Sequence, residues 1–292
     1  MTIPFEFGGK VAVMTGAASG LGRAFAQKAA ALGMKLVLAD VDGDALAACV
    51  TALRDQGAEA VGVTTDVSQS AQVEALAQAA LDTFGKVHLL FNNAGVGTGG
   101  FVWENTEKDW TWVLGVNVMG VAHGVRVFAP IMLRQKEPAH IVNTASVAGL
   151  LAPPAMGVYN VSKHAVVALT ETLYHDLRIV GTEVGCSLLC PAFVPTGIAE
   201  SYRARPEALR NTEAPTRSQA VAQVQLQRAV KSGKLSAADV AGLTFDAVRE
   251  RRFYILTHPA ILPSVHLRHE DIELMRNPTD PMSLKPETGY SA

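Results

Sequence analysis

The chain has 292 residues, 49% of them hydrophobic and 18% charged, and a formal net charge of −2. A chain of this size buries a large core, and its balanced charge disfavours a nucleic-acid-binding protein, which needs a basic stripe. Residues 1–9 lack the charged start and apolar run of a secretion signal, and no apolar stretch reaches the roughly 18 residues of a membrane span. We therefore expect a cytoplasmic protein with neither nucleic acid nor membrane as a partner.

A glycine-rich turn follows the first predicted strand, residues 10–15, and opens an Ala-rich helix. Glycines let the backbone approach a pyrophosphate, and a helix N-terminus offers unpaired N–H groups and the positive end of its dipole. The spacing Gly-x3-Gly-x-Gly predicts a nucleotide site more strongly than its alternative, a simple tight loop. The residues expected at the cofactor are Gly16, Ser19, Gly20, Leu21 and Gly22.

Asp40 ends the second predicted strand, residues 35–39. A carboxylate there accepts hydrogen bonds from the 2′- and 3′-hydroxyls of a ribose and repels a 2′-phosphate. No Arg or Lys stands beside it at positions 17, 18 or 41. The pattern predicts NAD rather than NADP, and the alternative is an Asp that only begins a surface turn with Asp42 and Gly43.

Strand and helix patterns alternate along the chain without a linker. This alternation predicts an α/β fold, a single doubly wound Rossmann-type domain with a seven-stranded parallel sheet flanked by helices, whose crevice lies at the carboxyl ends of the strands. The predicted strands are 10–15, 35–39, 58–64, 87–91, 141–145, 184–189 and 252–256, and two long helices cover 106–133 and 157–179. We expect a dinucleotide-binding and catalytic domain at 1–259, a lid insertion at about 200–235, and a C-terminal extension at 260–292.

Tyr159 and Lys163 stand one helical turn apart in the second long helix, so their side chains lie on one face of it. A phenol titrates near pH ~10, and lowering its pKa by ~3 units favours the phenolate by about 4 kcal/mol. A nearby ammonium acts in that direction. The pair therefore predicts a tyrosine that exchanges protons near neutral pH, with an ordinary surface contact as the alternative.

Taken together, these residues resemble the short-chain dehydrogenase/reductase family, from residue 10 to about residue 259. The family's cofactor marks appear in order, as Thr15 with the glycine-rich turn, Asp66 and Val67 for the adenine, Asn92, Asn93, Ala94 and Gly95 after the fourth strand, and Pro191, Val194 and Thr196 before the lid. Its catalytic tetrad falls on Asn117, Ser146, Tyr159 and Lys163. One departure is Ala192, where the family usually has glycine, and it puts only local backbone geometry in doubt.

The resemblance implies a role for each member of the tetrad. Tyr159 exchanges a proton with the substrate oxygen, and Lys163 lowers the pKa of Tyr159 and binds the nicotinamide ribose. Ser146 orients the substrate oxygen, and Asn117 holds a water that links Lys163 to solvent. The family also assembles commonly as dimers or tetramers, so we expect a homodimer or homotetramer. The chemistry needs no metal, and we predict no metal site.

We therefore predict an oxidoreductase that transfers a hydride between NAD(H) and the carbinol or carbonyl carbon of a hydrophobic or aromatic secondary alcohol or ketone. The alternative is a nucleotide-binding regulatory protein that keeps the fold without turnover, and the complete tetrad argues against it. The substrate class rests on apolar residues expected around the site. They are Val96, Ala148, Leu150, Leu151, Met156, Phe193 and Ile198.

Several features outside this core carry weaker signals. Arg203, Arg205, Arg210 and Arg217 of the lid could meet an anionic substrate group, but a solvated face is the favoured interpretation. A capping-box pattern predicts a helix start at residues 236–239, and residues 264–276 are expected to form a helix that packs on a neighbouring subunit or over the site. His266 and His269 are taken as an ordinary exposed pair, and the three cysteines as reduced thiols.

Overall fold

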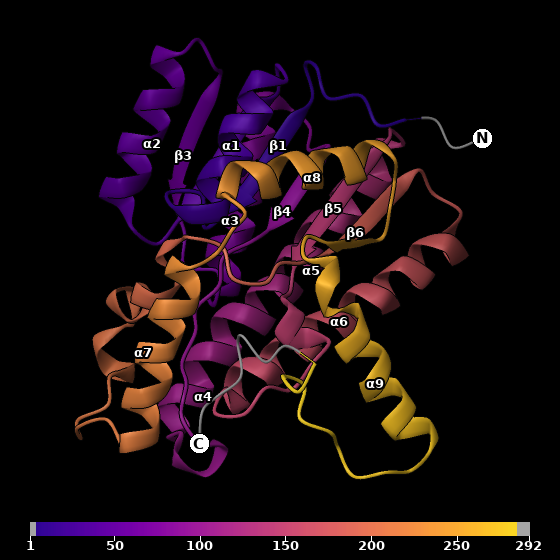
Figure 1. The fold of residues 1–292 in the computed structure, drawn as a ribbon. Helices are drawn as coiled ribbons and strands as arrows, with labels where there is room; N and C mark the ends of the chain where they lie inside the picture. Colours follow the sequence, from indigo (N-terminus) through magenta and orange to yellow (C-terminus); the bar gives the residue numbers. More distant parts are fainter. Residues whose placement is uncertain (1–3, 285–292) are drawn as a thin grey trace.

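The computed structural model describes residues 4–284 and contains a parallel sheet of seven strands in the order β3-β2-β1-β4-β5-β6-β7 (Figure 1). The chain order reverses between β1 and β4, where open α/β sheets form their ligand crevice. The predicted fold class is confirmed. The strands are β1 Val11–Thr15, β2 Lys35–Asp40, β3 Ala60–Thr64, β4 Leu89–Asn92, β5 Ala139–Thr144, β6 Val184–Cys190 and β7 Tyr254–Leu256.

Helices cover both faces of the sheet, so β1 and β5 are buried along their whole length. On one face, α1, α2 and α8 pack around Phe25, whose ring stacks on Phe91 with centroids 4.7 Å apart. On the other face, α3, α5 and α6 bury Leu76, Phe128 and Met132. The helices are α1 Gly20–Ala31, α2 Gly43–Asp55, α3 Ser70–Phe84, α4 Glu107–Leu114, α5 Gly120–Gln135, α6 Gly157–Val180, α7 Arg217–Lys231, α8 Ala237–Arg249 and α9 Leu262–Glu273.

The predicted elements are present, and most bounds move by a residue or two, as element ends commonly do. The long helix expected over 106–133 is present as a continuous helical stretch, residues 107–135, but the sequence did not predict the π-helical turn inside it, Gly115–Met119, that joins α4 to α5. The turn carries Asn117, whose side chain bonds the backbone of Val96, a non-local contact that no local periodicity reveals.

The segment between β6 and α8 consists of short helices, as expected for the lid. A 3-10 helix, Gly197–Ala204, is followed by a second, Glu207–Leu209, and then by α7. Capping boxes begin α7 at Thr216 and α8 at Ser236, the latter as predicted. The predicted helix at 264–276 is present as α9, while the end of the C-terminal extension, 285–292, lies outside the described residues.

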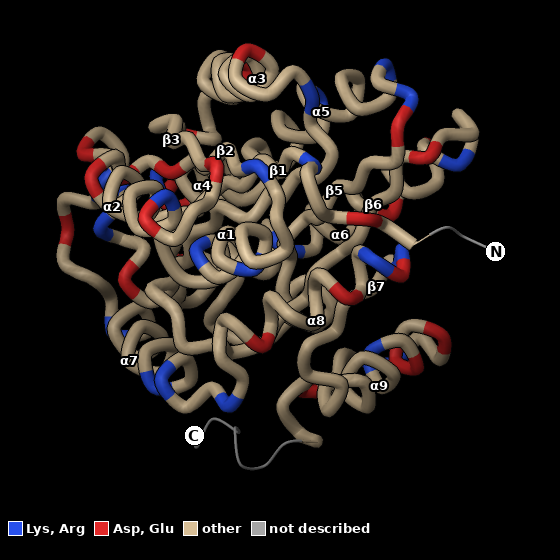
Figure 2. The backbone as a smooth tube through the Cα atoms, turned by 90° about the horizontal axis from the view of Figure 1, so that it is seen from above, with Lys and Arg blue, Asp and Glu red and all other residues tan. Residues whose placement is uncertain are grey.

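One continuous helical stretch, residues 107–135, is long and apolar enough to cross a membrane by length and composition alone. It is the single such stretch among residues 4–284, and 39% of its most apolar window is buried. Within this stretch, α5 packs on the sheet through Phe128 and Met132. Figure 2 shows acidic and basic residues interspersed over the outer helices.

Candidate active site

A cavity of about 510 Å³ opens at the carboxyl ends of the strands. It is lined by residues from the glycine-rich turn, the ends of β2, β4, β5 and β6, the start of α6 and the lid. Sixteen of the eighteen predicted site residues line it, and the two exceptions, Gly22 and Asn117, lie directly behind its wall. Those that line it are Gly16, Ser19, Gly20, Leu21, Asp40, Asp66, Val67, Asn93, Ala94, Gly95, Ser146, Tyr159, Lys163, Pro191, Val194 and Thr196.

The glycine-rich turn is so tightly packed that it has no room for side chains. A Cβ on Gly22 would lie 1.9 Å from the carbonyl oxygen of Gly16 and 2.8 Å from Nδ2 of Asn93. Gly16 itself has a φ of +65°, and a Cβ there would lie 2.9 Å from the Cα of Ala94. The turn therefore presents bare backbone at the N-terminus of α1, which fits the phosphates of a dinucleotide.

Thr15 and Asn93 hold this turn against the end of β4. The Oγ1 of Thr15 accepts the backbone N–H groups of Asn93 at 2.9 Å and Ala94 at 3.1 Å, and Nδ2 of Asn93 donates to the carbonyl of Thr15 at 3.0 Å. Thr15 belongs to the motif recognised in the sequence, but its supporting role was missed. A polar residue at the last position of a buried strand was the signal.

Two carboxylates lie at strand ends on the same side of the cavity. Asp40 is fixed by backbone N–H groups, which Ala18 donates to Oδ2 at 2.9 Å and Asp42 donates to Oδ1 at 3.1 Å. Asp66 accepts the N–H of Ser68 at 2.9 Å and its hydroxyl at 2.7 Å, both at Oδ1. Both carboxylates are thus held in fixed orientations by neighbouring N–H and hydroxyl groups.

Tyr159 and Lys163 lie on one face of α6, as the sequence predicts. The Nζ of Lys163 sits 5.6 Å from the centroid of the Tyr159 ring and donates to the carbonyl of Thr144 at 3.0 Å. Burial raises the pKa of Tyr159, and a hydrogen bond with Ser146 offsets only part of that effect. The predicted lowering of this pKa is therefore wrong for this structure. The reason is burial, which periodicity does not reveal and which outweighs the hydrogen bond with Ser146.

Ser146 is the third polar residue in this part of the cavity, beside Tyr159 and Lys163. Its Oγ donates to the carbonyl of Pro191 at 3.3 Å and accepts the N–H of Ala148 at 3.1 Å. These bonds hold the hydroxyl at the end of β5, beside Tyr159. The chain then turns away, so the predicted pocket residues Leu150 and Leu151 do not line the cavity, and Leu150 packs on the core beneath.

Asn117 is fully buried, and both polar atoms of its side-chain amide are bonded to protein groups. Its Nδ2 donates to the carbonyl of Val96 at 2.9 Å and to Oγ of Ser162 at 3.0 Å, while Oδ1 accepts the N–H of Val96 at 2.8 Å. The water-holding role implied by the resemblance stays a prediction. Ser162, next to Lys163 in sequence, was missed as the partner of this amide.

The far half of the cavity is mostly apolar, although hydroxyl side chains such as Thr98 and Ser201 also line the cavity. Among the described residues, the charged ones that line the cavity are Asp40, Asp66 and Lys163, all in the half formed by the glycine-rich turn and the strand ends. The apolar half includes the predicted Val96, Ala148, Met156, Phe193 and Ile198, and adds Trp112, Pro206, Leu209, Leu226 and Val230, which sequence reasoning missed. The additional residues come from α4 and the lid, whose placement depends on tertiary contacts.

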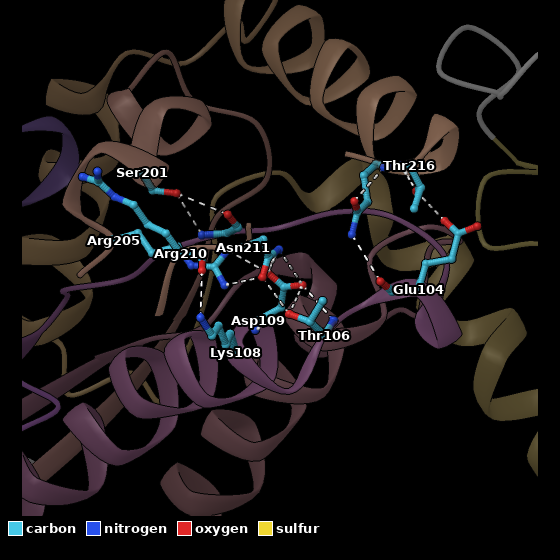
Figure 3. Close-up of polar contacts among 11 residues, drawn as sticks. Glu104, Thr106, Lys108, Asp109, Ser201, Arg205, Arg210, Asn211 and Thr216 are labelled. Atoms are coloured by element: carbon cyan, nitrogen blue, oxygen red, sulfur yellow. Dashed lines mark hydrogen bonds and ion pairs between the residues drawn. The ribbon is translucent and has the colours of Figure 1, made fainter. Parts of the chain in front are cut away.

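Arg205 neither faces solvent nor enters the cavity, so both sequence interpretations of this residue are wrong. Its Nη1 pairs with Oδ1 of Asp109 at 2.7 Å, and its side chain is only 11% exposed (Figure 3). Glu104 makes a second connection to the lid, accepting hydrogen bonds from the hydroxyls of Thr216 and Ser218. Asp109 and Glu104 therefore hold the lid in place through hydrogen bonds and an ion pair.

The buried ammonium of Lys163 gives a testable dependence of stability on pH. Burial lowers its pKa from 10.5 to about 8. The unfolded chain then binds more protons between these values, so the contribution of Lys163 to the free energy of unfolding rises as pH rises through this window, by at most about 3 kcal/mol. We expect the free energy of urea unfolding of wild type, relative to a Lys163→Met variant, to rise by up to this amount between pH 7.5 and pH 10.5. An unchanged difference would mean that the ammonium is not destabilised by burial.

The sequence matches a known family across nearly all of these site residues. Residues 10–207 fit the family described as short chain dehydrogenase. The chain is a short-chain dehydrogenase/reductase. Among solved structures, the short-chain dehydrogenase/reductase of Burkholderia phymatum in complex with NAD is 76% identical, with a TM-score of 0.95 over 96% of this chain and 99% of that one.

Curated relatives of this short-chain dehydrogenase/reductase match most of its length. The CLA biosynthesis dehydrogenase/reductase of Lactiplantibacillus plantarum is 36% identical over 90% of this chain and 93% of that protein. The 1-deoxy-11-beta-hydroxypentalenate dehydrogenase of Streptomyces exfoliatus is 35% identical over 85% of this chain and 83% of that protein. The resemblance noted in the sequence is confirmed.

Proposed function

We propose that this oxidoreductase transfers a hydride between NAD(H) and the carbinol or carbonyl carbon of a hydrophobic or aromatic secondary alcohol or ketone. The observation that carries the proposal is the position of Ser146, Tyr159 and Lys163 within one cavity, between a half that fits a dinucleotide and a half that is apolar. A substrate oxygen beside Tyr159 and Ser146 would place its carbon between these two halves.

The side chains divide the proton chemistry among them. Tyr159 is protonated at neutral pH, because burial raises its pKa, and donates its proton to a carbonyl oxygen during reduction. During oxidation Tyr159 first releases its proton to solvent, and the resulting phenolate, stabilised by Ser146 and Lys163, then accepts the alcohol proton. Ser146 also shares the negative charge that develops on the substrate oxygen. Bound NAD supplies the acceptor or donor of the hydride.

NAD rather than NADP is supported by Asp40. Its carboxylate is held by two backbone N–H groups at the end of β2, where it accepts ribose hydroxyls and repels a 2′-phosphate. The relative from Burkholderia phymatum was solved in complex with NAD. Thr196 lies against the turn, since a Cβ on Gly20 would come within 3.1 Å of it, and this position suits a contact to the nicotinamide amide.

An uncharged substrate is supported by the apolar half of the cavity, whose lining includes Trp112, Phe193 and Leu209. A carboxylate placed there would lose its hydration without gaining a charged partner, which costs several kcal/mol. The names of the relatives describe dehydrogenases and reductases, in line with this reaction class.

The proposed reaction is tested with a panel of secondary alcohols and ketones, followed by NADH absorbance. We expect turnover with neutral aromatic or long-chain members, little or none with matched carboxylates, and a clear preference for NAD over NADP. Silence across the panel, together with NAD binding in calorimetry, would instead support the regulatory alternative. Preference for the carboxylates would contradict the neutral substrate class.

The remaining parts of the proposal concern assembly and location. We propose a cytoplasmic homodimer or homotetramer that associates through its long helices, of which α6 leaves Val161 47% and Ile179 83% exposed. The division into a catalytic domain, 1–259, and a C-terminal extension, 260–292, also stays a prediction.

A further inference from the structure

We propose that Asp109 and Arg205 are positioning residues that fix the outer wall of the apolar half of the cavity and so set the binding of large substrates. The inference rests on the proposed function, because it concerns the substrate half of that site. Neither residue lines the cavity itself. They act through Trp112 and through the lid residues that follow Ala204.

Asp109 anchors the pair from α4. Its side chain is 1% exposed, and Oδ2 accepts both the N–H of Thr106 at 2.8 Å and its hydroxyl at 3.0 Å. Burial opposes its ionisation, but hydrogen bonds from Thr106 and Arg205 outweigh burial and hold the pKa of Asp109 below its ordinary value. The acid is therefore a fixed negative charge in the first turn of α4, one turn from Trp112.

Arg205 fills the space between this charge and the cavity wall. Its guanidinium lies 5.0 Å from the centroid of the Trp112 ring, and Trp112 is 3% exposed and lines the cavity. One side of the arginine thus pairs with a carboxylate, and its planar group covers the indole. This arrangement holds the indole from behind, in contact with Val96 and Leu209 of the same apolar cluster.

Asn211 ties the far end of lid residues 205–211 to the same pair, Asp109 and Arg205. Its Nδ2 donates to Oδ1 of Asp109 at 3.1 Å, and its Oδ1 accepts from Thr106 at 2.8 Å and from Arg205 at 3.4 Å (Figure 3). Residues 205 and 211 are therefore tied to the same acid. Pro206 and Leu209, which lie between them, line the cavity, so the loop that carries them is fixed at both ends.

This placement predicts a specific kinetic signature. Within residues 4–284, the side chain of Ser146 bonds Pro191 and Ala148, and that of Lys163 bonds Thr144, so these hydrogen bonds do not reach Asp109 or Arg205. Loosening the outer wall should weaken the binding of substrates that reach Trp112, while leaving the chemical step and NAD binding unchanged. Small substrates that occupy only the space beside Tyr159 should be insensitive.

The test compares Arg205→Gln with Arg203→Gln, a matched control that removes the same charge from an exposed position two residues away. With a long aromatic alcohol, Arg205→Gln should raise KM about tenfold with kcat within about twofold, whereas KM for a short alcohol and the Kd for NAD stay at wild-type values. Arg203→Gln should match wild type throughout. Arg205→Lys, which keeps the charge but not the planar fork, should fall between the two.

Hydrogen exchange gives a readout that does not need turnover. The amides of Arg205, Leu209 and Arg210 are bonded within the lid to Tyr202, Pro206 and Glu207. They should exchange at least about tenfold faster in Arg205→Gln than in Arg203→Gln. Equal exchange in the two variants overturns the proposal, and so does a KM that rises equally for short and long alcohols. A wild-type enzyme that turns over no alcohol would refute the proposed function while the exchange result still decides this inference.

Discussion

Replacing Tyr159 by Phe should lower kcat with the best alcohol or ketone by about 10²–10⁴-fold, because the substrate oxygen loses the side chain that exchanges its proton. The ring remains and still packs beneath Lys163, whose Nζ is bonded to the carbonyl of Thr144 rather than to the phenol. The Kd for NAD, measured by calorimetry, should therefore stay within about threefold of wild type. Stopped-flow absorbance of NADH separates the two effects.

A matched control lies on the same helix. Tyr174 is part of α6, and its hydroxyl accepts from Arg178 at 3.2 Å, away from the cavity. Tyr174→Phe removes the same atom and should leave both kcat and the Kd for NAD unchanged. If Tyr159→Phe kept wild-type turnover, the proton transfer assigned to Tyr159 would be refuted, whatever the fate of the control.

Replacing Gly22 by Ala should abolish NAD binding and destabilise the fold. The added Cβ would lie 1.9 Å from the carbonyl oxygen of Gly16, and that contact is with backbone, which cannot rotate away as a side chain does. Overpacking of this kind costs about 1–3 kcal/mol, and its relief must move the turn that we propose for the phosphates. Calorimetry should detect no NAD binding at concentrations that saturate wild type, and Tm should fall.

Replacing Gly242 by Ala is the matched control, and we expect it to stabilise the protein rather than destabilise it. It lies within α8, and a Cβ there would meet nothing within 4 Å. Gly242→Ala should therefore leave NAD binding unchanged and raise the free energy of unfolding by about 0.5–1 kcal/mol, because alanine favours a helix over glycine. Normal NAD binding by Gly22→Ala would show that the turn does not form the cofactor site.

Local patterns were enough to predict most of this fold. The buried strands and the helices between them follow from runs of apolar residues and from caps such as Ser236, and alternating elements leave few arrangements other than a doubly wound parallel sheet. Strand ends in such a sheet converge on one crevice, so Asp40, Asp66 and Ser146, which follow strand ends, were expected to share a cavity. The family resemblance, rather than position alone, had singled out Asp66 and Ser146.

The features that the sequence did not predict share a different cause. The π-helical turn at Asn117, the raised pKa of Tyr159 and the contact of Arg205 with Asp109 all depend on groups far away in the chain. An arginine in a polar insertion has the same local signature whether it faces water or a buried acid. Leu150 shows the same limit, because an apolar residue near a site lines the cavity or the core according to how the chain turns after Ser146.

The sequence by itself determined the family, the sheet, and the residues that bring a nucleotide turn and a Tyr159–Lys163 pair together, because these depend on spacing within elements and on the order of the elements. Only the tertiary structure decided the protonation of Tyr159, the shape of the apolar half and the fastening of the lid. Burial and contacts between distant segments fix those properties, and both arise from how the elements pack rather than from any one of them.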